Sequence, residues 1–117
     1  KKKDINNSKI LVLGLAYKKN VDDVRESPSV EIMELLREDG AIVEYSDPHV
    51  QKFPVMRDHK FELDSIELSK KSLSEYDAVI ISTDHDRFDY DLIKENSSLV
   101  VDCRGVYRDN FLGLIKS

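Results

Sequence analysis

Ile10-Leu11-Val12-Leu13-Gly14 is the stretch that decides the fold. Four consecutive apolar residues that end at a glycine are typical of a strand buried on both faces of a parallel sheet. Residues 78–83 and 99–102 are predicted to be core strands of the same kind. The centre of the protein is therefore expected to be a sheet of buried strands.

Helix signals separate these strands. Ser27-Pro28 supplies an N-cap and a proline at the first helical position, and Gly40 stands where a C-cap belongs, which predicts a helix over residues 28–39. A strand over residues 41–45 follows, and Asp47-Pro48 ends it because proline donates no ladder hydrogen bond. The apolar stripe of the helix consists of Val30, Ile32, Met33, Leu35 and Leu36.

The other stretches continue the alternation. Short helices are predicted at residues 69–76 and 89–94, and the last stretch, residues 111–115, is amphipathic. Residues 50–68 fit either a loop or a short edge strand. Alternating strands and helices predict an α/β fold, a Rossmann-like, doubly wound and mainly parallel sheet covered on both sides.

Length and composition favour a single domain. A chain of 117 residues that is 40% hydrophobic can bury a real core. Residues 1–8 are polar and are interpreted as a linker remnant, with the domain at residues 9–117. No apolar run approaches the roughly 20 residues needed to cross a bilayer, and the start of the sequence lacks the apolar part of a signal peptide. We therefore expect a soluble, cytoplasmic protein without a membrane partner.

Charge and cysteine content exclude further classes. A net charge of −5 argues against a nucleic-acid partner, because phosphate-backbone binding needs a broad basic face. The single cysteine, Cys103, excludes an internal disulfide and a multi-cysteine metal site. His49, His59 and His85 lack metal-ligand spacing, and for His85 a loop-stabilising hydrogen bond is favoured over a ligand contact.

Ligands of open parallel sheets bind beyond the carboxyl ends of the strands, and three polar segments are expected to meet there. These segments are residues 14–27, 83–86 and 102–104. The first contains a single glycine, Gly14, where a dinucleotide turn needs G-x-G-x-x-G. Its polar side chains predict a clamp for an anionic ligand in place of a glycine cradle. An ion pair between Asp23 and Arg25 that only fixes the loop is the alternative.

Five blocks of the sequence resemble one known family. In order, they closely resemble blocks of the C-terminal domain of the UDP-glucose/GDP-mannose dehydrogenase family, and the resemblance covers practically the whole chain. The blocks are Val12-Leu13-Gly14-Leu15-Ala16-Tyr17-Lys18-Lys19, Asp22-Asp23-Val24-Arg25-Glu26-Ser27-Pro28, Tyr45-Ser46-Asp47-Pro48, Ser82-Thr83-Asp84-His85-Asp86 with Phe88, and Val100-Val101-Asp102-Cys103-Arg104.

The resemblance implies a binding role. Tyr17 and Lys18 match the pair that holds the uridine and phosphate side of a UDP-sugar, and Arg104 falls in a block that supplies a further substrate contact. Arg25 matches an arginine that approaches the phosphates of the cofactor NAD. Gly105 departs from the family pattern, which leaves the contacting residue of that block open.

The resemblance also implies what other parts of a longer chain would do. Enzymes of the family oxidise the C6 alcohol of a nucleotide sugar to a carboxylate, with an N-terminal domain that binds NAD and a middle helical region that contains the catalytic cysteine. Cys103 does not match that cysteine, so it is expected to be a buried structural thiol. No catalytic residue and no metal ligand are predicted here, and the isolated chain is expected to be inactive and monomeric.

We therefore expect the chain to be the UDP-binding domain of an NAD-dependent UDP-sugar 6-dehydrogenase. The full-length enzyme is expected to be a homo-oligomer. Residues 82–91 most resemble the branch of the family that acts on UDP-N-acetylhexosamines, so this resemblance implies such a substrate, with UDP-glucose as the alternative. A stand-alone, non-catalytic nucleotide-binding module is a further alternative. A complete small NAD-binding module is disfavoured by the missing glycines after Gly14. A phospho-receiver domain is disfavoured because Gly14-Leu15 stands where its acidic pair belongs.

Overall fold

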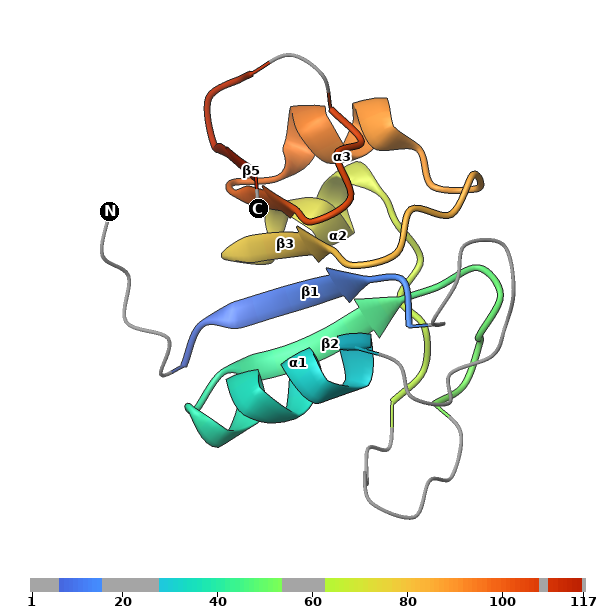
Figure 1. Ribbon diagram of the computed structural model, residues 1–117, viewed down its shortest axis with the longest axis vertical. Helices are drawn as coiled ribbons and strands as arrows, with labels where there is room; N and C mark the ends of the chain where they lie inside the picture. Colours follow the sequence, from blue (N-terminus) through green and yellow to red (C-terminus); the bar gives the residue numbers. More distant parts are fainter. Residues whose placement is uncertain (1–6, 16–27, 54–62, 108–109, 117) are drawn as a thin grey trace.

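A five-stranded parallel sheet forms the centre of the described part of the chain (Figure 1). The computed structural model describes residues 7–15, 28–53, 63–107 and 110–116. Spatially, the strand order is β2-β1-β3-β4-β5. The strands are β1 (Lys9–Leu13), β2 (Ile42–Ser46), β3 (Ala78–Ile81), β4 (Val100–Asp102) and β5 (Leu114–Lys116).

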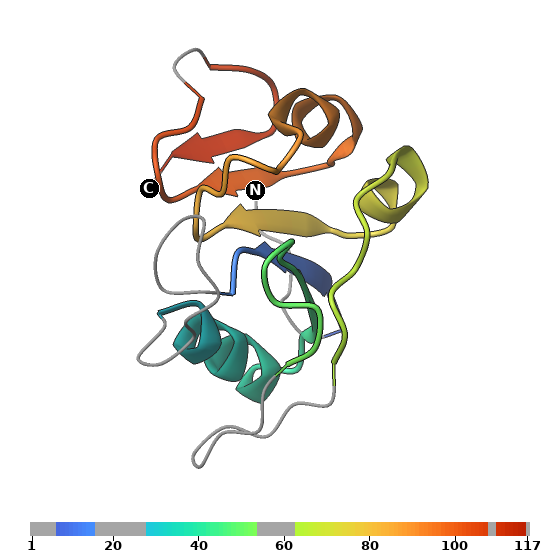
Figure 2. The ribbon, with the colours of Figure 1, turned by 90° about the vertical axis from the view of Figure 1, so that its right-hand side faces the viewer.

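Helices cover both faces of this sheet (Figure 2). They are α1 (Pro28–Glu38), α2 (Lys70–Ser74) and α3 (Tyr90–Asn96). The interior strand β1 directs alternate residues to the two faces, as a strand must. Ile10 and Val12 pack with α1 residues, whereas Leu11 and Leu13 pack with residues of α2 and α3. The predicted doubly wound α/β fold is confirmed.

Some predicted boundaries change. The third predicted strand ends at Ile81, two residues early, because the N–H groups of Ser82 and Thr83 both donate to the carbonyl of Leu13, at 2.9 and 3.1 Å. The chain leaves the ladder at that point. Residues 50–68, left open above, contain an antiparallel bridge between Lys52 and Asp64, and residues 54–62 lie outside the described part.

One residue of the predicted apolar stripe is exposed to solvent. Leu35 is 61% exposed, whereas Val30 and Met33 are buried. At 3.6 residues per turn, Leu35 lies about 200° around α1 from Met33, on the side away from the sheet. The amphipathic end of the chain forms the edge strand β5, in which Ile115 is 48% exposed. None of the described helices is long and apolar enough to cross a bilayer.

Candidate functional site

The carboxyl ends of four parallel strands lie side by side. The register pairs Leu13 with both Ser46 and Ile81, and Ile81 with Asp102, so the last residues of β2, β1, β3 and β4 are neighbours in that order. In Figure 1 the arrowheads of β1, β2 and β3 point to the same side of the molecule. The predicted meeting of polar segments at one edge of the sheet is confirmed for their described residues.

Gly14 sets how the chain leaves β1. Its N–H donates to the carbonyl of Ser46 at 2.9 Å, and its φ of +92° is a conformation that side chains disfavour. A Cβ on Gly14 would lie 2.5 Å from the Cβ of Thr83. The close approach of the β1 and β3 ends therefore requires glycine at this position.

The clamp residues predicted for the first loop, Tyr17, Lys18 and Arg25, lie outside the described residues, and their roles stay predictions. The structure does place both ends of that loop. At its start, the N–H of Leu15 donates to Asp47 Oδ2 at 2.7 Å. At its end, Ser29 Oγ in α1 donates to Ser82 Oγ at 2.5 Å.

Arg104 shares an anchor with the end of that loop. Its side-chain Nε–H donates to the carbonyl oxygen of Ser82 at 2.8 Å, and its backbone N–H donates to Asp102 Oδ1 at 3.0 Å. Ser82 therefore contacts both the first turn of α1, through Ser29, and Arg104. The predicted substrate residue Arg104 is exposed at the carboxyl edge, and the prediction of its ligand contact stays a prediction.

Asp102 organises the turn that carries Arg104. The side chain is buried, and it accepts the N–H of Tyr107 on Oδ2 at 2.9 Å as well as that of Arg104. Burial alone would raise the pKa of Asp102, but the backbone hydrogen bonds outweigh burial and lower this pKa below its usual value. The carboxylate therefore stays charged and holds the turn closed.

Cys103, in the same turn, is exposed. The expectation of a buried structural thiol is wrong. β4 ends at Asp102, so Cys103 is already past the strand, in the turn that the Asp102 carboxylate closes.

Asp47 was not predicted as a site residue. It is fully buried. Its Oδ2 accepts the N–H of Leu15 at 2.7 Å and lies 2.9 Å from Nε2 of the His85 ring. Its Oδ1 accepts the N–H of His49 at 2.7 Å. The sequence signal is an aspartate before a proline, which favours a local turn and ends the preceding strand, and Asp47 also belongs to one of the blocks that resemble the family.

The expected loop-stabilising hydrogen bond of His85 is confirmed by its contact with Asp47. The ring of His49 also lies against that of His85, with centroids 4.7 Å apart, although the two residues are distant in sequence. Among the described residues no three potential ligands gather as a metal site would require.

The match with a family model agrees with this geometry. Residues 11–109 match the model described as "UDP-glucose/GDP-mannose dehydrogenase family, UDP binding domain". The chain belongs to this family. The resemblance seen in the sequence blocks is thereby confirmed.

Relatives of this family domain include enzymes named for different sugars. The chain is 34% identical over 113 residues to a UDP-glucose 6-dehydrogenase of Rhizobium meliloti, covering 90% of this chain and 25% of the relative. It is 38% identical over 88 residues to a UDP-N-acetyl-D-mannosamine dehydrogenase of Methanococcus maripaludis, covering 75% and 18%. The chain thus spans about a quarter or less of these relatives.

Solved structures contain the same fold. A UDP-glucose dehydrogenase from Pyrobaculum islandicum matches with a TM-score of 0.67 and 32% identity, over 96% of this chain and 25% of that one. A UDP-D-ManNAc dehydrogenase from Pyrococcus horikoshii matches with a TM-score of 0.70 and 25% identity, over 97% and 25%. Each of these longer proteins therefore contains a domain with the fold described here.

A groove lies beside the carboxyl edge of this domain. It has a volume of about 540 Å³. Its lining consists of residues 65–68, the end of β2, the start of α3, and Arg87 and Phe88, which precede α3 in the sequence. The sequence does not predict this groove, because residues 50–68 have no regular hydrophobic period from which their position could be inferred.

Proposed function

We propose that this chain binds the UDP part of a UDP-sugar for an NAD-dependent UDP-sugar 6-dehydrogenase. The observation that carries the proposal is the shared anchor at Ser82, which ties Arg104 and the end of the loop containing Tyr17 and Lys18 to one point. Lysine and arginine are suited to diphosphate oxygens, and the aromatic ring of Tyr17 offers a face to uracil. The family match supports UDP as the nucleotide.

The fit of a dinucleotide to the first turn can be tested on the described atoms. The N–H of Gly14 donates to Ser46 and that of Leu15 donates to Asp47, so neither is available to a pyrophosphate. This turn does not fit NAD. NAD would be held mainly by an N-terminal domain outside this chain, and Arg25 is proposed to reach its phosphates from here. Hydride acceptance is the chemistry that NAD would supply.

The other parts of the proposal concern the whole protein. The longer enzyme would be cytoplasmic and homo-oligomeric, and it would oxidise the sugar C6 alcohol with a cysteine from its middle helical region. UDP-N-acetylhexosamine is the proposed substrate, with UDP-glucose as the alternative, since relatives of both names match. The isolated chain is proposed to be inactive, because in the family the catalytic cysteine and the NAD-binding turn belong to other parts of the longer protein.

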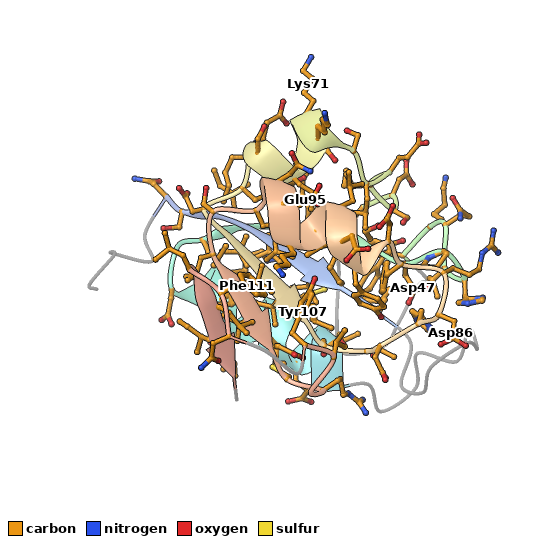
Figure 3. The ribbon with its side chains drawn as sticks, turned by 90° about the horizontal axis from the view of Figure 1, so that it is seen from above. Asp47, Lys71, Asp86, Glu95, Tyr107 and Phe111 are labelled. Carbon is orange, nitrogen blue, oxygen red and sulfur yellow. The ribbon has the colours of Figure 1, made fainter. Side chains whose placement is uncertain are left out.

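Calorimetric titration of the chain with UDP tests the proposal. We expect weak, saturable binding, with little binding of GDP or NAD. Replacing Lys18 or Arg104 with alanine should weaken UDP binding about tenfold each, the size of one charge-assisted hydrogen bond. Lys71→Ala is the matched control, because Lys71 is an exposed lysine on α2, far from Asp47 and Asp86 in Figure 3.

Two results would contradict the proposal. One is the lack of saturable UDP binding at millimolar concentration, and the other is an equal loss of affinity in the Lys71→Ala control. Tight NAD binding by the chain alone would instead favour a complete NAD-binding module.

A further inference from the structure

The pair formed by Asp47 and His85 joins three strand ends. Asp47 follows β2, Leu15 follows β1 and His85 follows β3 by a few residues. The carboxylate of Asp47 contacts the Leu15 N–H and the His85 Nε2 through the same oxygen, at 2.7 and 2.9 Å. Because a carboxylate only accepts hydrogen bonds, the His85 Nε2 carries the hydrogen.

Burial makes this arrangement specific. Both side chains have an exposed fraction of 0%. A buried carboxylate is costly unless its oxygens are hydrogen-bonded, and here two backbone N–H groups and one ring nitrogen satisfy it. A shift of Leu15 away from Asp47 would remove one of these donors, so the carboxylate strongly favours one path of the chain out of β1.

The His85 segment also contacts the turn that carries Arg104. Tyr90 donates its hydroxyl to the carbonyl of His85 at 2.7 Å, and Tyr107 donates its hydroxyl to the carbonyl of Tyr90 at 2.5 Å. Burial raises the pKa of both tyrosines, so they remain neutral donors. The Tyr107 N–H in turn donates to Asp102, which closes the turn around Arg104.

Ring contacts run along the same path. The ring of Phe88 lies 5.6 Å from that of His85 and 6.0 Å from that of Tyr90, and Tyr90 lies 6.3 Å from Tyr107 between ring centroids. Tyr107 then contacts Phe111 at 5.1 Å, and the two are neighbours in Figure 3. The segment that holds Asp47 in place is thus packed continuously onto the Arg104 turn.

We propose that Asp47 and His85 are positioning residues for the nucleotide site. Asp47 fixes Leu15, and hence the start of the loop with Tyr17 and Lys18, while His85 fixes Asp47 and connects it to the turn with Arg104. Both are buried, so they act through Leu15 and through the turn with Arg104, and not on the ligand. The inference rests on the proposed UDP binding for its functional meaning.

Three variants of the pair test this inference in the full chain. Asp47→Asn keeps the side-chain volume but turns an NH₂ group toward at least one N–H donor. His85→Leu removes the ring donor, and His85→Gln restores a donor near the position of Nε2. Tyr76→Phe is the control, because it removes a hydrogen bond to the carboxylate of Glu44 from a buried tyrosine before β3, away from the carboxyl edge.

Two readouts separate positioning from stability, at a temperature where circular dichroism shows each variant to be folded. The first is the exchange rate of the Leu15 amide without ligand, measured by NMR, and the second is the dissociation constant for UDP. Asp47→Asn and His85→Leu should accelerate the exchange and weaken UDP binding about tenfold. His85→Gln should recover most of both, and Tyr76→Phe should change neither.

Unchanged UDP affinity in folded Asp47→Asn and His85→Leu would overturn the inference. If Asp47→Asn does not fold, the comparison of His85→Leu with His85→Gln decides the question, and equal affinities there overturn it. If the unaltered chain binds no UDP, the proposed function fails, but the Leu15 exchange still decides whether the pair positions this segment.

Discussion

Gly14 and Gly105 have similar backbone conformations but different surroundings. Their φ angles are +92° and +70°, both in the region that side chains disfavour. A Cβ at Gly14 would also lie 2.8 Å from backbone atoms of Thr83, whereas a Cβ at Gly105 would meet nothing within 4 Å. Substitutions at the two glycines therefore separate the free-energy cost of backbone strain from that of a steric clash.

Gly14→Ala should destabilise the protein far more than Gly105→Ala. Backbone strain should cost each variant about 1–2 kcal/mol, because the left-handed conformation brings Cβ close to the following carbonyl. At Gly14 overpacking against Thr83 adds about 1–3 kcal/mol. Urea unfolding measures both losses. Equal losses would mean that the ends of β1 and β3 can separate at little cost.

At the scale of elements, the short helix α2 depends on its N-terminal cap and on one buried residue. It has five residues, too few for a helix to be stable by propensity alone. Ser69 forms a capping box, in which its Oγ accepts the Ser72 N–H at 3.0 Å and Ser72 Oγ accepts the Ser69 N–H at 2.9 Å. Only Leu73 of this helix is buried, and it packs in the cluster shared with α3.

Ser69→Ala should lower the free energy of unfolding by about 1 kcal/mol, the usual value of an N-cap. Ser74→Ala is the matched control, because Ser74 lies at the other end of α2 and its hydroxyl only donates to the carbonyl of Lys71. It should change stability by less than about 0.5 kcal/mol. Chemical denaturation of the two variants side by side measures the difference, and a larger loss in Ser74→Ala would contradict the capping argument.

At the scale of the whole molecule, strands β1 and β3 contribute to both hydrophobic clusters. β1 supplies Ile10 and Val12 to the cluster under α1, and Leu11 and Leu13 to the cluster under α2 and α3. Loss of β1 would expose both clusters at once. The sheet and the helices on its two faces should therefore unfold together.

Met33→Ala and Ile93→Ala test this on opposite faces of the sheet. Each should cost about 2–5 kcal/mol, because both side chains are fully buried. Far-UV circular dichroism and tyrosine fluorescence should give coincident urea transitions in both variants. Leu35→Ala, on the exposed side of α1, should change stability by less than about 0.5 kcal/mol. Separate transitions for the two probes would show that the two faces unfold independently.

Local sequence patterns determined much of this protein. The apolar runs at β1, β3 and β4, the proline and glycine signals around α1, and the family resemblance together predicted the fold class, the family and the edge of the sheet where polar segments meet. These features depend on backbone sterics, side-chain periodicity and short motifs, all of which can be read within a few residues.

Only the tertiary structure decided which polar groups contact one another. Asp47 and His85 belong to separate segments, and their pairing depends on the parallel register that brings the ends of β1, β2 and β3 together. The same holds for Ser29, Ser82 and Arg104. The exposure of Cys103 depends on how the turn after β4 folds around the Asp102 carboxylate. Contacts between distant segments follow from register and packing, which short-range patterns do not encode.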